Sequence, residues 1–157
     1  MTRKNLFLIG ITLVLAALYV IYFTDWFHSD GVQISHTSRP VTQRVGNPRI
    51  QAVFDASAPV IFFFDKELRL TRLKVFLVSE LQTNQFALPL WHLVSDSNSP
   101  PLKNLTYGMP VRGMHTANKG QFAQPLVPGN LYRLFIEAGD RKGQHDFEAK
   151  PKLKGRS

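Results

Sequence analysis

The sequence predicts an all-β sandwich preceded by one N-terminal transmembrane helix. The apolar run at residues 6–23 contains no charged residue, and a helix of this length crosses a bilayer. The chain after it alternates short apolar stretches with turn residues every 8 to 12 residues or so, which gives about seven strands in about 100 residues. Near its end, residues 126–138 combine a turn with strict apolar alternation, which is the period of a β-strand.

The apolar run has the properties of an uncleaved membrane anchor. Its 18 residues span about 27 Å as a helix, at about 1.5 Å per residue, close to the thickness of a hydrocarbon core. A cleaved signal peptide is the alternative, but its apolar region is usually shorter, and no Ala-x-Ala cleavage site follows this run. Gly10 and Ala17 are small residues on one helix face, which would permit close packing against another helix.

The residues that flank the run indicate its orientation. Arg3 and Lys4 precede it, whereas Tyr22 and Trp26 lie at its far end, where aromatic rings favour the membrane interface. Because basic residues are retained on the cytoplasmic side, we expect a cytoplasmic N-terminus. The predicted location is the inner (plasma) membrane, with the domain on the periplasmic side.

Changes in composition mark a linker before the predicted domain and a tail after it. The stretch after the anchor is rich in Ser, Thr, Gly and Pro and predicts a tether, in which Val32 and Ile34 are candidates for a short strand. At the other end, basic residues predict a solvated tail, with contact to anionic lipid headgroups or to an acidic partner as the alternative. The expected parts are a cytoplasmic N-terminus (1–5), a transmembrane helix (6–27), a linker (28–48), a β-sandwich domain (49–149) and a basic C-terminal tail (150–157).

Apolar periodicity predicts the strands of the domain. Residues 60–64 form a continuous apolar run, as expected for a buried strand. The alternation between residues 68 and 80 changes phase at residues 71–72, which indicates a bulge or a strand end. Trp91 is expected in the core because burying an indole ring removes a large apolar area from water. Other strands are expected at 50–55, 88–94, 105–107 and 144–149, with turns or loops at 65–67, 95–101 and 139–143.

The turn and strand at residues 126–138 have the spacing of a tyrosine corner. A tyrosine placed just after such a turn can bury its ring and return its hydroxyl to the backbone a few residues upstream, as in immunoglobulin-like sandwiches. The spacing also resembles the end of a fibronectin type III domain, Leu-x-Pro-Gly-x-x-Tyr followed by apolar-x-apolar-x-Ala. The matching residues are Leu126, Pro128, Gly129, Tyr132, Leu134, Ile136 and Ala138. The resemblance implies a fold and names no activity, because such sandwiches host many unrelated functions.

The stretch at residues 109–124 has no regular period and predicts a long loop. Loops on a rigid sandwich commonly carry recognition. Met109, Met114 and Phe122 are candidates for adaptable apolar contacts with a partner, and Arg112 and Lys119 are candidates for pairing with acidic groups around them. The alternative is a mobile surface loop without a partner.

Few residues suggest chemistry. The chain contains no cysteine, which excludes disulfides and thiolate metal sites. Met109, Met114 and His115 lie close in sequence, and thioether with imidazole suits copper, but their spacing matches no copper carrier. No nucleophile elbow or phosphate-binding glycine loop is present. We therefore expect no cofactor and no enzyme activity.

The expected function is that of a non-catalytic accessory subunit. One span, one small domain and an excess of positive charge, +8 overall, suit a sandwich that docks onto an integral membrane protein complex, for example a respiratory or photosynthetic assembly. The alternative is a free-standing exported module that binds a cell-wall, glycan or small-molecule ligand. A nucleic-acid partner is not expected, because no recognisable binding motif accompanies the charge.

Overall fold

The computed structural model describes residues 5, 10–16, 18–19, 31–39, 46–97 and 99–152, in two compact units, Met1–Asp30 and Gly31–Ser157. In the first unit, residues 10–16 and 18–19 are helical, and Gly10 is exposed. Within the described part of the chain, no helix is both long and apolar enough to cross a membrane. Much of the predicted span at 6–27 lies outside the described residues, so the anchor stays a prediction. The flanking and packing residues outside them are Arg3, Lys4, Ala17, Tyr22 and Trp26.

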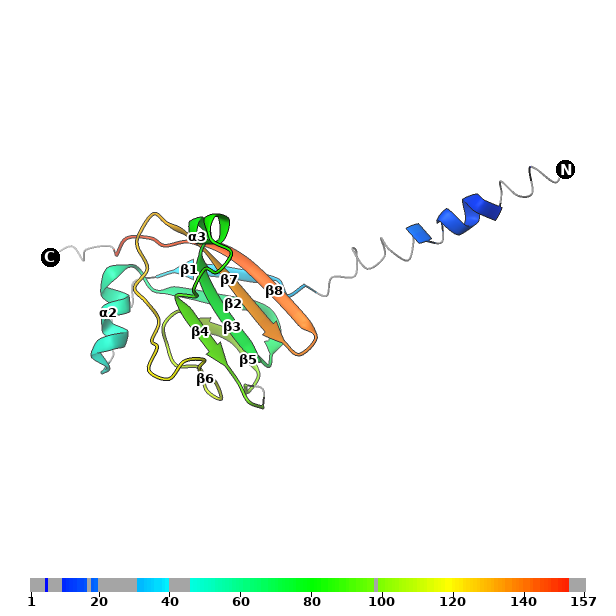
Figure 1. Cartoon of the computed structure of the whole chain (residues 1–157). Helices are drawn as coiled ribbons and strands as arrows, with labels where there is room; N and C mark the ends of the chain where they lie inside the picture. The colour runs from blue at the N-terminus through cyan, green and yellow to red at the C-terminus, as the bar shows by residue number, and fades with distance from the viewer. Residues whose placement is uncertain are drawn as a thin grey trace. The chain divides into compact units, whose positions relative to one another are not determined.

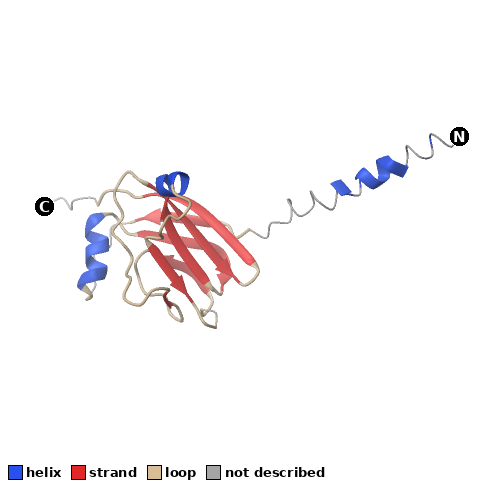
Figure 2. Ribbon diagram, in the orientation of Figure 1, coloured by secondary structure: helices blue, strands red, loops and turns tan. Residues whose placement is uncertain are grey.

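The second unit consists mostly of β-strands in two antiparallel sheets, as an all-β sandwich requires (Figures 1 and 2). The three-stranded sheet has the order β1-β2-β5, and the five-stranded sheet has the order β6-β4-β3-β7-β8. The strands are β1 (Ile34–Ser38), β2 (Val60–Leu68), β3 (Arg72–Leu77), β4 (Trp91–Val94), β5 (Leu102–Thr106), β6 (His115–Thr116), β7 (Leu131–Ala138) and β8 (Arg141–Glu148). The helices of this unit are α2 (Pro48–Ala56) and α3 (Val78–Thr83).

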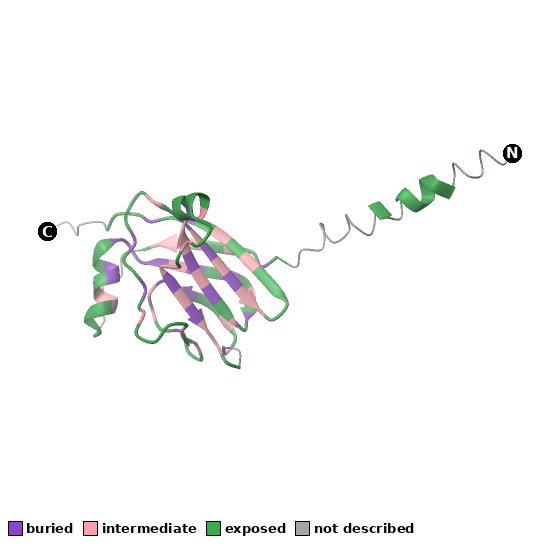
Figure 3. Ribbon diagram, in the orientation of Figure 1, coloured by how far each residue is buried: buried purple, intermediate pink, exposed green. Residues whose placement is uncertain are grey.

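The core lies between the two sheets and is built mainly from alternating inward residues of the longer strands, with Val53 and Phe54 of the segment 48–56 added (Figure 3). Phe62 of β2 and Phe147 of β8 meet edge to face across it, with ring centroids 4.9 Å apart. Tyr132 stacks on the other side of this contact, 5.7 Å from Phe147. Trp91 is buried, as predicted, with 3% of its surface exposed. Because offset and edge-to-face ring pairs add to the gain from burial, this aromatic group is central to the association of the sheets.

The predicted strand at residues 50–55 is wrong, because these residues belong to helix α2. Asn47 caps the helix by accepting a hydrogen bond from the Arg49 backbone N–H at 3.0 Å, and Pro48 occupies the first turn. Both are common start signals for a helix. The helix buries Val53 and Phe54.

The predicted domain boundary at residue 49 is also wrong. Strand β1 lies inside the predicted linker 28–48 and pairs with β2 along its whole length, from Ile34 opposite Phe64 to Ser38 opposite Val60. Val32, just before β1, is buried in the core. The sandwich therefore includes the chain from Gly31 onward.

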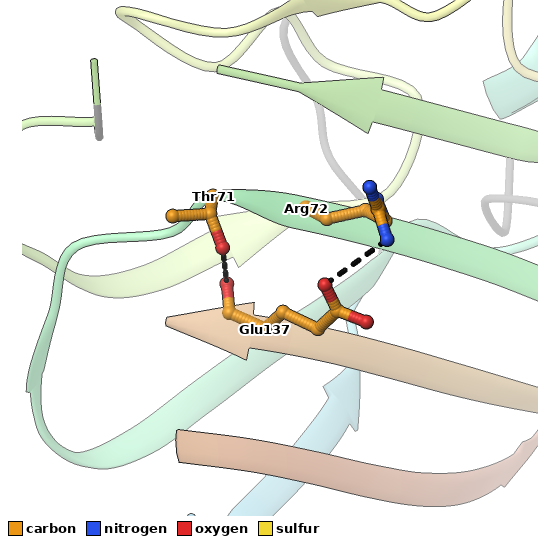
Figure 4. A network of polar contacts seen from close by, with 3 residues as sticks. All are labelled: Thr71, Arg72 and Glu137. Atoms are coloured by element: carbon orange, nitrogen blue, oxygen red, sulfur yellow. Dashed lines mark hydrogen bonds and ion pairs between the residues drawn. The ribbon is translucent and has the colours of Figure 1, made fainter. Parts of the chain in front are cut away.

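Several strand ends differ from the expectation. The predicted turn at residues 65–67 is part of β2, which continues to Leu68. The phase change at residues 71–72 is a strand end, because β3 starts at Arg72. There, Thr71 Oγ1 donates to the Glu137 carbonyl at 3.0 Å, and Arg72 Nη1 lies 3.2 Å from Glu137 Oε2 (Figure 4). These contacts hold the start of β3 against β7.

Other segments are shorter or shifted. The strand expected at 88–94 begins only at Trp91, and the strand expected at 105–107 is β5, which ends at Thr106. Residues 78–80, expected to continue β3, begin helix α3. The hairpin loop expected at 139–143 is reduced to Gly139 and Asp140, because β8 already starts at Arg141.

Candidate functional site

The loop between β5 and β7 borders an apolar pocket of about 240 Å³. Three elements contribute its walls: α2 with Ile50, β4 with Trp91, and the loop itself with Met109, Met114 and Phe122. The loop runs beside α2 in Figure 1 (yellow against blue-green). The pocket thus forms where the long connection between β5 and β7 meets helix α2 and strand β4.

The loop is fixed at both ends by specific contacts. At its start, Gly108 adopts a positive φ of 77°, and a Cβ on it would lie 3.0 Å from Cγ1 of Val53. The glycine therefore permits both the turn and the close approach to α2. At its end, the Gln124 carbonyl accepts a hydrogen bond from the Tyr107 hydroxyl at 2.8 Å. Burial raises the pKa of Tyr107, so its hydroxyl stays protonated and keeps donating.

Hydrogen bonds to the neighbouring strand continue along the loop. The Ala117 backbone N–H donates to the His92 carbonyl at 3.1 Å, and the Gln124 N–H donates to the Leu90 carbonyl at 3.0 Å. Within the loop, the Met114 N–H donates to the Val111 carbonyl at 3.0 Å. The methionines are therefore presented from a backbone that the sheet holds in place.

The structure brings together three of the five residues predicted as partner contacts. Met109, Met114 and Phe122 line the pocket, whereas Arg112 and Lys119 are exposed and do not line it. Arg112 lies next to the pocket-lining Val111 in sequence. The interpretation of this stretch as a surface loop is correct, except for the two residues of β6.

Sequence reasoning missed the walls that come from other elements. Arg49 places its guanidinium 4.7 Å from the centre of the Phe122 ring, a cation–π contact at the mouth of the pocket. The sequence pattern predicts a strand at Ile50, whereas the structure places this residue on helix α2, where it lines the pocket. The Asn47–Pro48 start signal was the feature that would have revealed this wall.

Two arginines are next to pocket-lining residues: Arg49 contacts the Phe122 ring, and Arg112 follows Val111 in the chain. We call Arg49 and Arg112 the basic rim; both are exposed. His115, which also lines the pocket, has its Nε2 atom 3.9 Å from Oδ1 of Asp96, and both side chains are exposed. The site thus offers an apolar interior with cations beside it.

The pocket is lined mainly by apolar side chains. Across the described residues, no three His, Cys, Asp or Glu side chains gather closely enough to hold a metal ion. Met109, Met114 and His115 do line the same pocket, so the structure brings together the three residues whose side chains suit copper. The lining mainly offers dispersion contact and removal of apolar surface from water, because most of its side chains are apolar, two methionines and two aromatic residues among them.

The predicted corner residues occupy the opposite end of the same connection. The Val127 backbone N–H donates to the Tyr132 hydroxyl at 2.8 Å, and Leu126 and Tyr132 are buried. Gly129 has a positive φ of 86°, and its N–H donates to the Ala149 carbonyl at 2.8 Å. The corner therefore fixes the chain as it leaves the loop and enters β7.

Two features of the chain invite comparison with known proteins, namely the sandwich with its corner and the pocket beside the loop. Comparison with protein-family models, with curated proteins and with solved structures finds no match.

Proposed function

We propose that the protein is a non-catalytic accessory subunit, anchored by one transmembrane helix, whose exported sandwich docks onto a larger integral membrane complex. A respiratory or photosynthetic assembly is the kind of host that fits. The main support for the proposal is the pocket, because Met109, Met114 and Phe122, which the sequence predicts as partner contacts, line it together. Aromatic residues and methionine are enriched at the cores of protein interfaces.

Strand order supports an immunoglobulin-like sandwich of the fibronectin type III kind. In the letters of that fold, β1-β2-β5 corresponds to A-B-E, and β4-β3-β7-β8 corresponds to C′-C-F-G. Tyr132 then lies near the start of strand F, where the tyrosine corner occurs in such sandwiches. Sandwiches of this kind are common as recognition domains, and they present loops at both ends.

The size of the pocket favours a protein side chain as its occupant. Pockets for small-molecule ligands usually enclose about 300–1,000 Å³, and this one is smaller, about 240 Å³. One Leu, Phe or Met side chain gains about 1.5–3 kcal/mol when it is fully buried. The basic rim then favours carboxylates on either side of the inserted residue, which would speed association and make it salt-dependent. The partner segment is thus an apolar residue with acidic neighbours.

Features of both chain ends support attachment at a membrane. In the first unit, the described helical residues expose large apolar side chains, which water solvates poorly. They are Ile11, Leu13, Val14, Leu15 and Leu18. At the other end, Lys152 Nζ lies 2.8 Å from Oδ1 of Asp55 on α2, so this lysine contacts the domain. Contact between the basic tail and lipid would therefore involve the residues after Lys152.

The test compares two exposed phenylalanines in the full-length chain. Phe122 borders the pocket and is 42% exposed, whereas Phe86 lies in the connection between α3 and β4 and is 82% exposed. Membranes that contain wild type, Phe122→Ser or Phe86→Ser are solubilised in mild detergent, and the tagged protein is purified with its partners. We expect Phe122→Ser to lose the partner while Phe86→Ser retains it, with unfolding midpoints that stay close to wild type.

Two outcomes would contradict the proposal. If Phe122→Ser retains the partner as well as wild type does, the pocket is not the docking surface. If wild type purifies alone, the subunit function is wrong, and the free-standing exported binding module becomes the better candidate. An Arg112→Glu variant adds a check on the partner's chemistry, since it should weaken association most at low salt.

A further inference from the structure

Two partly buried histidines face each other across the open edge of the sandwich. His36 lies on β1, an edge strand of the three-stranded sheet, and His145 lies on β8, an edge strand of the five-stranded sheet. Nδ1 of His36 is 2.7 Å from Nε2 of His145, and the ring centroids are 5.0 Å apart. Both nitrogens therefore lie between the rings, in a hydrogen bond that needs one N–H donor and one unprotonated acceptor.

The seam around this pair is closely packed. A Cβ on Gly143, two residues before His145 on β8, would lie 3.1 Å from Cδ1 of Ile34, so β1 approaches β8 closely at this point. On the other side, the His36 ring centroid is 6.0 Å from that of Phe147. The Ser38 hydroxyl is buried and makes no hydrogen bond within the described structure. The contacts that Ile34 and Phe147 make at this seam are therefore apolar.

The charged groups near the pair act in opposite directions. Lys150, just after β8, disfavours a proton on His36. Asp146 favours a proton on His145, but this carboxylate already accepts two hydrogen bonds from Arg133. Burial of the rings adds a cost for either charge.

We propose that His36 and His145 form a pH-sensitive latch, which holds β1 against β8 while the pair shares a hydrogen bond and releases β1 when both rings are protonated. Two imidazolium rings cannot share this bond, because both nitrogens then carry hydrogen, and their charges repel at 2.7 Å. The latch acts on the first strand of the sandwich, through which the chain from residues 1–30 enters the domain.

The direction of the pH effect follows from the pKa shifts. The pKa of His36 is lowered by burial, then by His145 and Lys150, and the pKa of His145 is lowered by burial against the opposing effect of Asp146. The unfolded chain therefore binds more protons than the folded one as pH falls below the ordinary histidine value of about 6.5. The stabilisation is complete above that value and is lost as pH falls through the lowered pKa values of the folded state.

Release of β1 would uncover an apolar strand. β1 pairs only with β2 in its sheet, and the residues of β2 that it covers include Phe62, Phe63 and Phe64. An uncovered edge of this composition is open to pairing with another chain. Acidification is therefore expected to loosen the N-terminal strand first and to expose an edge that associates.

The test follows unfolding and histidine titration in the full-length protein. Urea unfolding is measured between pH 5 and pH 8 for wild type, for the double variant His36→Gln/His145→Gln and for His115→Gln. His115 is an exposed histidine on β6, away from the seam, and serves as the matched control. We expect the midpoint of wild type and of the control to shift to lower urea as pH falls, and the midpoint of the double variant to shift less.

Two further measurements make the test decisive even if the double variant folds poorly. Imidazole NMR signals of wild type should show His36 and His145 titrating below the ordinary histidine value, and hydrogen exchange at acidic pH should accelerate in β1 before β7. The proposal is overturned if the double variant keeps the full pH-dependent shift, or if both histidines titrate as in the unfolded chain. It is also overturned if exchange in β1 and β7 accelerates together.

Discussion

The Tyr132 hydroxyl accepts a hydrogen bond from the backbone N–H of Val127, five residues earlier, at 2.8 Å. Its ring is 1% exposed and stacks on Phe147 of β8. One side chain therefore joins the turn, the start of β7 and the core. This contact explains why the spacing of the corner in the sequence carries structural information.

Substitution of Tyr132 by Phe should destabilise the sandwich without changing its fold. The ring stays in place, but the Val127 N–H loses its partner, and a hydrogen bond of this kind contributes about 0.5–1.5 kcal/mol net. Urea unfolding of the full-length chain measures the change. An unchanged midpoint would show that water replaces the hydroxyl at no cost and that the corner is not a stabilising device.

Truncation of Phe147 to Ala should cost much more. Phe147 contacts Phe62 of the opposite sheet and Tyr132 of its own, so its removal leaves a cavity between the sheets. Replacing a buried Phe by Ala typically costs about 3–5 kcal/mol. Phe86→Ala, at an exposed position, is the matched control and should be nearly neutral. Equal losses for the two variants would contradict the description of the core.

The elements that could be predicted from sequence are those whose causes are local. The alternation after Pro128–Gly129 marks β7, and the continuous apolar run at 60–64 marks the buried start of β2, since period and turn chemistry act over a few residues. The large apolar area of its indole ring predicts that Trp91 lies in the core, and it is buried. These features need no information from distant parts of the chain.

The sequence predictions fail, wholly or in part, for segments whose structure depends on distant contacts or on helix capping. The candidate short strand at Val32 and Ile34 is confirmed in part, because β1 begins at Ile34; its remaining residues, SHTS, are polar, and their pairing with β2 could not be predicted from the local pattern. Helix α2 depends on its Asn47 cap and on burial of Val53 and Phe54, which outweigh the strand-like look of the segment. The pocket could be predicted only in part, because composition identified Met109 and Met114, but its other walls come from these misassigned or distant elements.

The position of β1 leads to a prediction about truncation. A chain that begins at Gly31 should unfold cooperatively, whereas one that begins at Gly46 should be strongly destabilised. The shorter chain lacks β1 and leaves the β2 edge open, and it also removes Val32 and Ile34, which pack in or against the core. Near-ultraviolet circular dichroism and urea titration compare the two. If the shorter chain is as stable as the longer one, β1 is not an integral strand.

The ion pair between Arg133 and Asp146 should contribute modestly and in a pH-dependent way. The guanidinium donates to both carboxylate oxygens, at 2.5 and 2.7 Å, and these hydrogen bonds lower the pKa of Asp146. The stabilisation is therefore present above the ordinary aspartate value of about 3.9 and is lost as pH falls through the lowered folded value. Both side chains are about one-third exposed or more, so we expect Asp146→Asn to cost about 0.2–1 kcal/mol at neutral pH.

The matched control for this pair is Asp140→Asn, on the exposed turn of the same hairpin. Asp146→Asn should reduce the loss of stability as pH falls below about 4 more than Asp140→Asn does, and its effect at neutral pH should shrink in high salt. Asp146→Asn should also lower the pKa of His145, because Asp146 is the group that opposes the effect of burial there. An unchanged His145 titration by NMR would contradict this coupling.

The close approach of the Gly108 turn to helix α2 should determine the shape of the pocket. Gly108 and Gly120 both have positive φ, 77° and 83°, but only at Gly108 does an added Cβ meet other atoms, with Val53 Cγ1 at 3.0 Å and Ala123 Cβ at 3.6 Å. Both Ala variants carry the left-handed backbone cost of about 1–2 kcal/mol. Gly108→Ala should cost more than Gly120→Ala, because Val53 on α2 must also move.

The difference between these two variants isolates the contact between the loop and α2. Trp91 lines the pocket, so displacement of α2 or the loop should change its fluorescence in Gly108→Ala and leave it unchanged in Gly120→Ala. If Met109 and Ile50 move apart, the pocket widens, and binding of the partner that we propose should weaken in Gly108→Ala even where the domain remains folded. Equal costs and unchanged fluorescence in both variants would mean that α2 adapts freely, and that the close approach at Gly108 does not set the shape of the pocket.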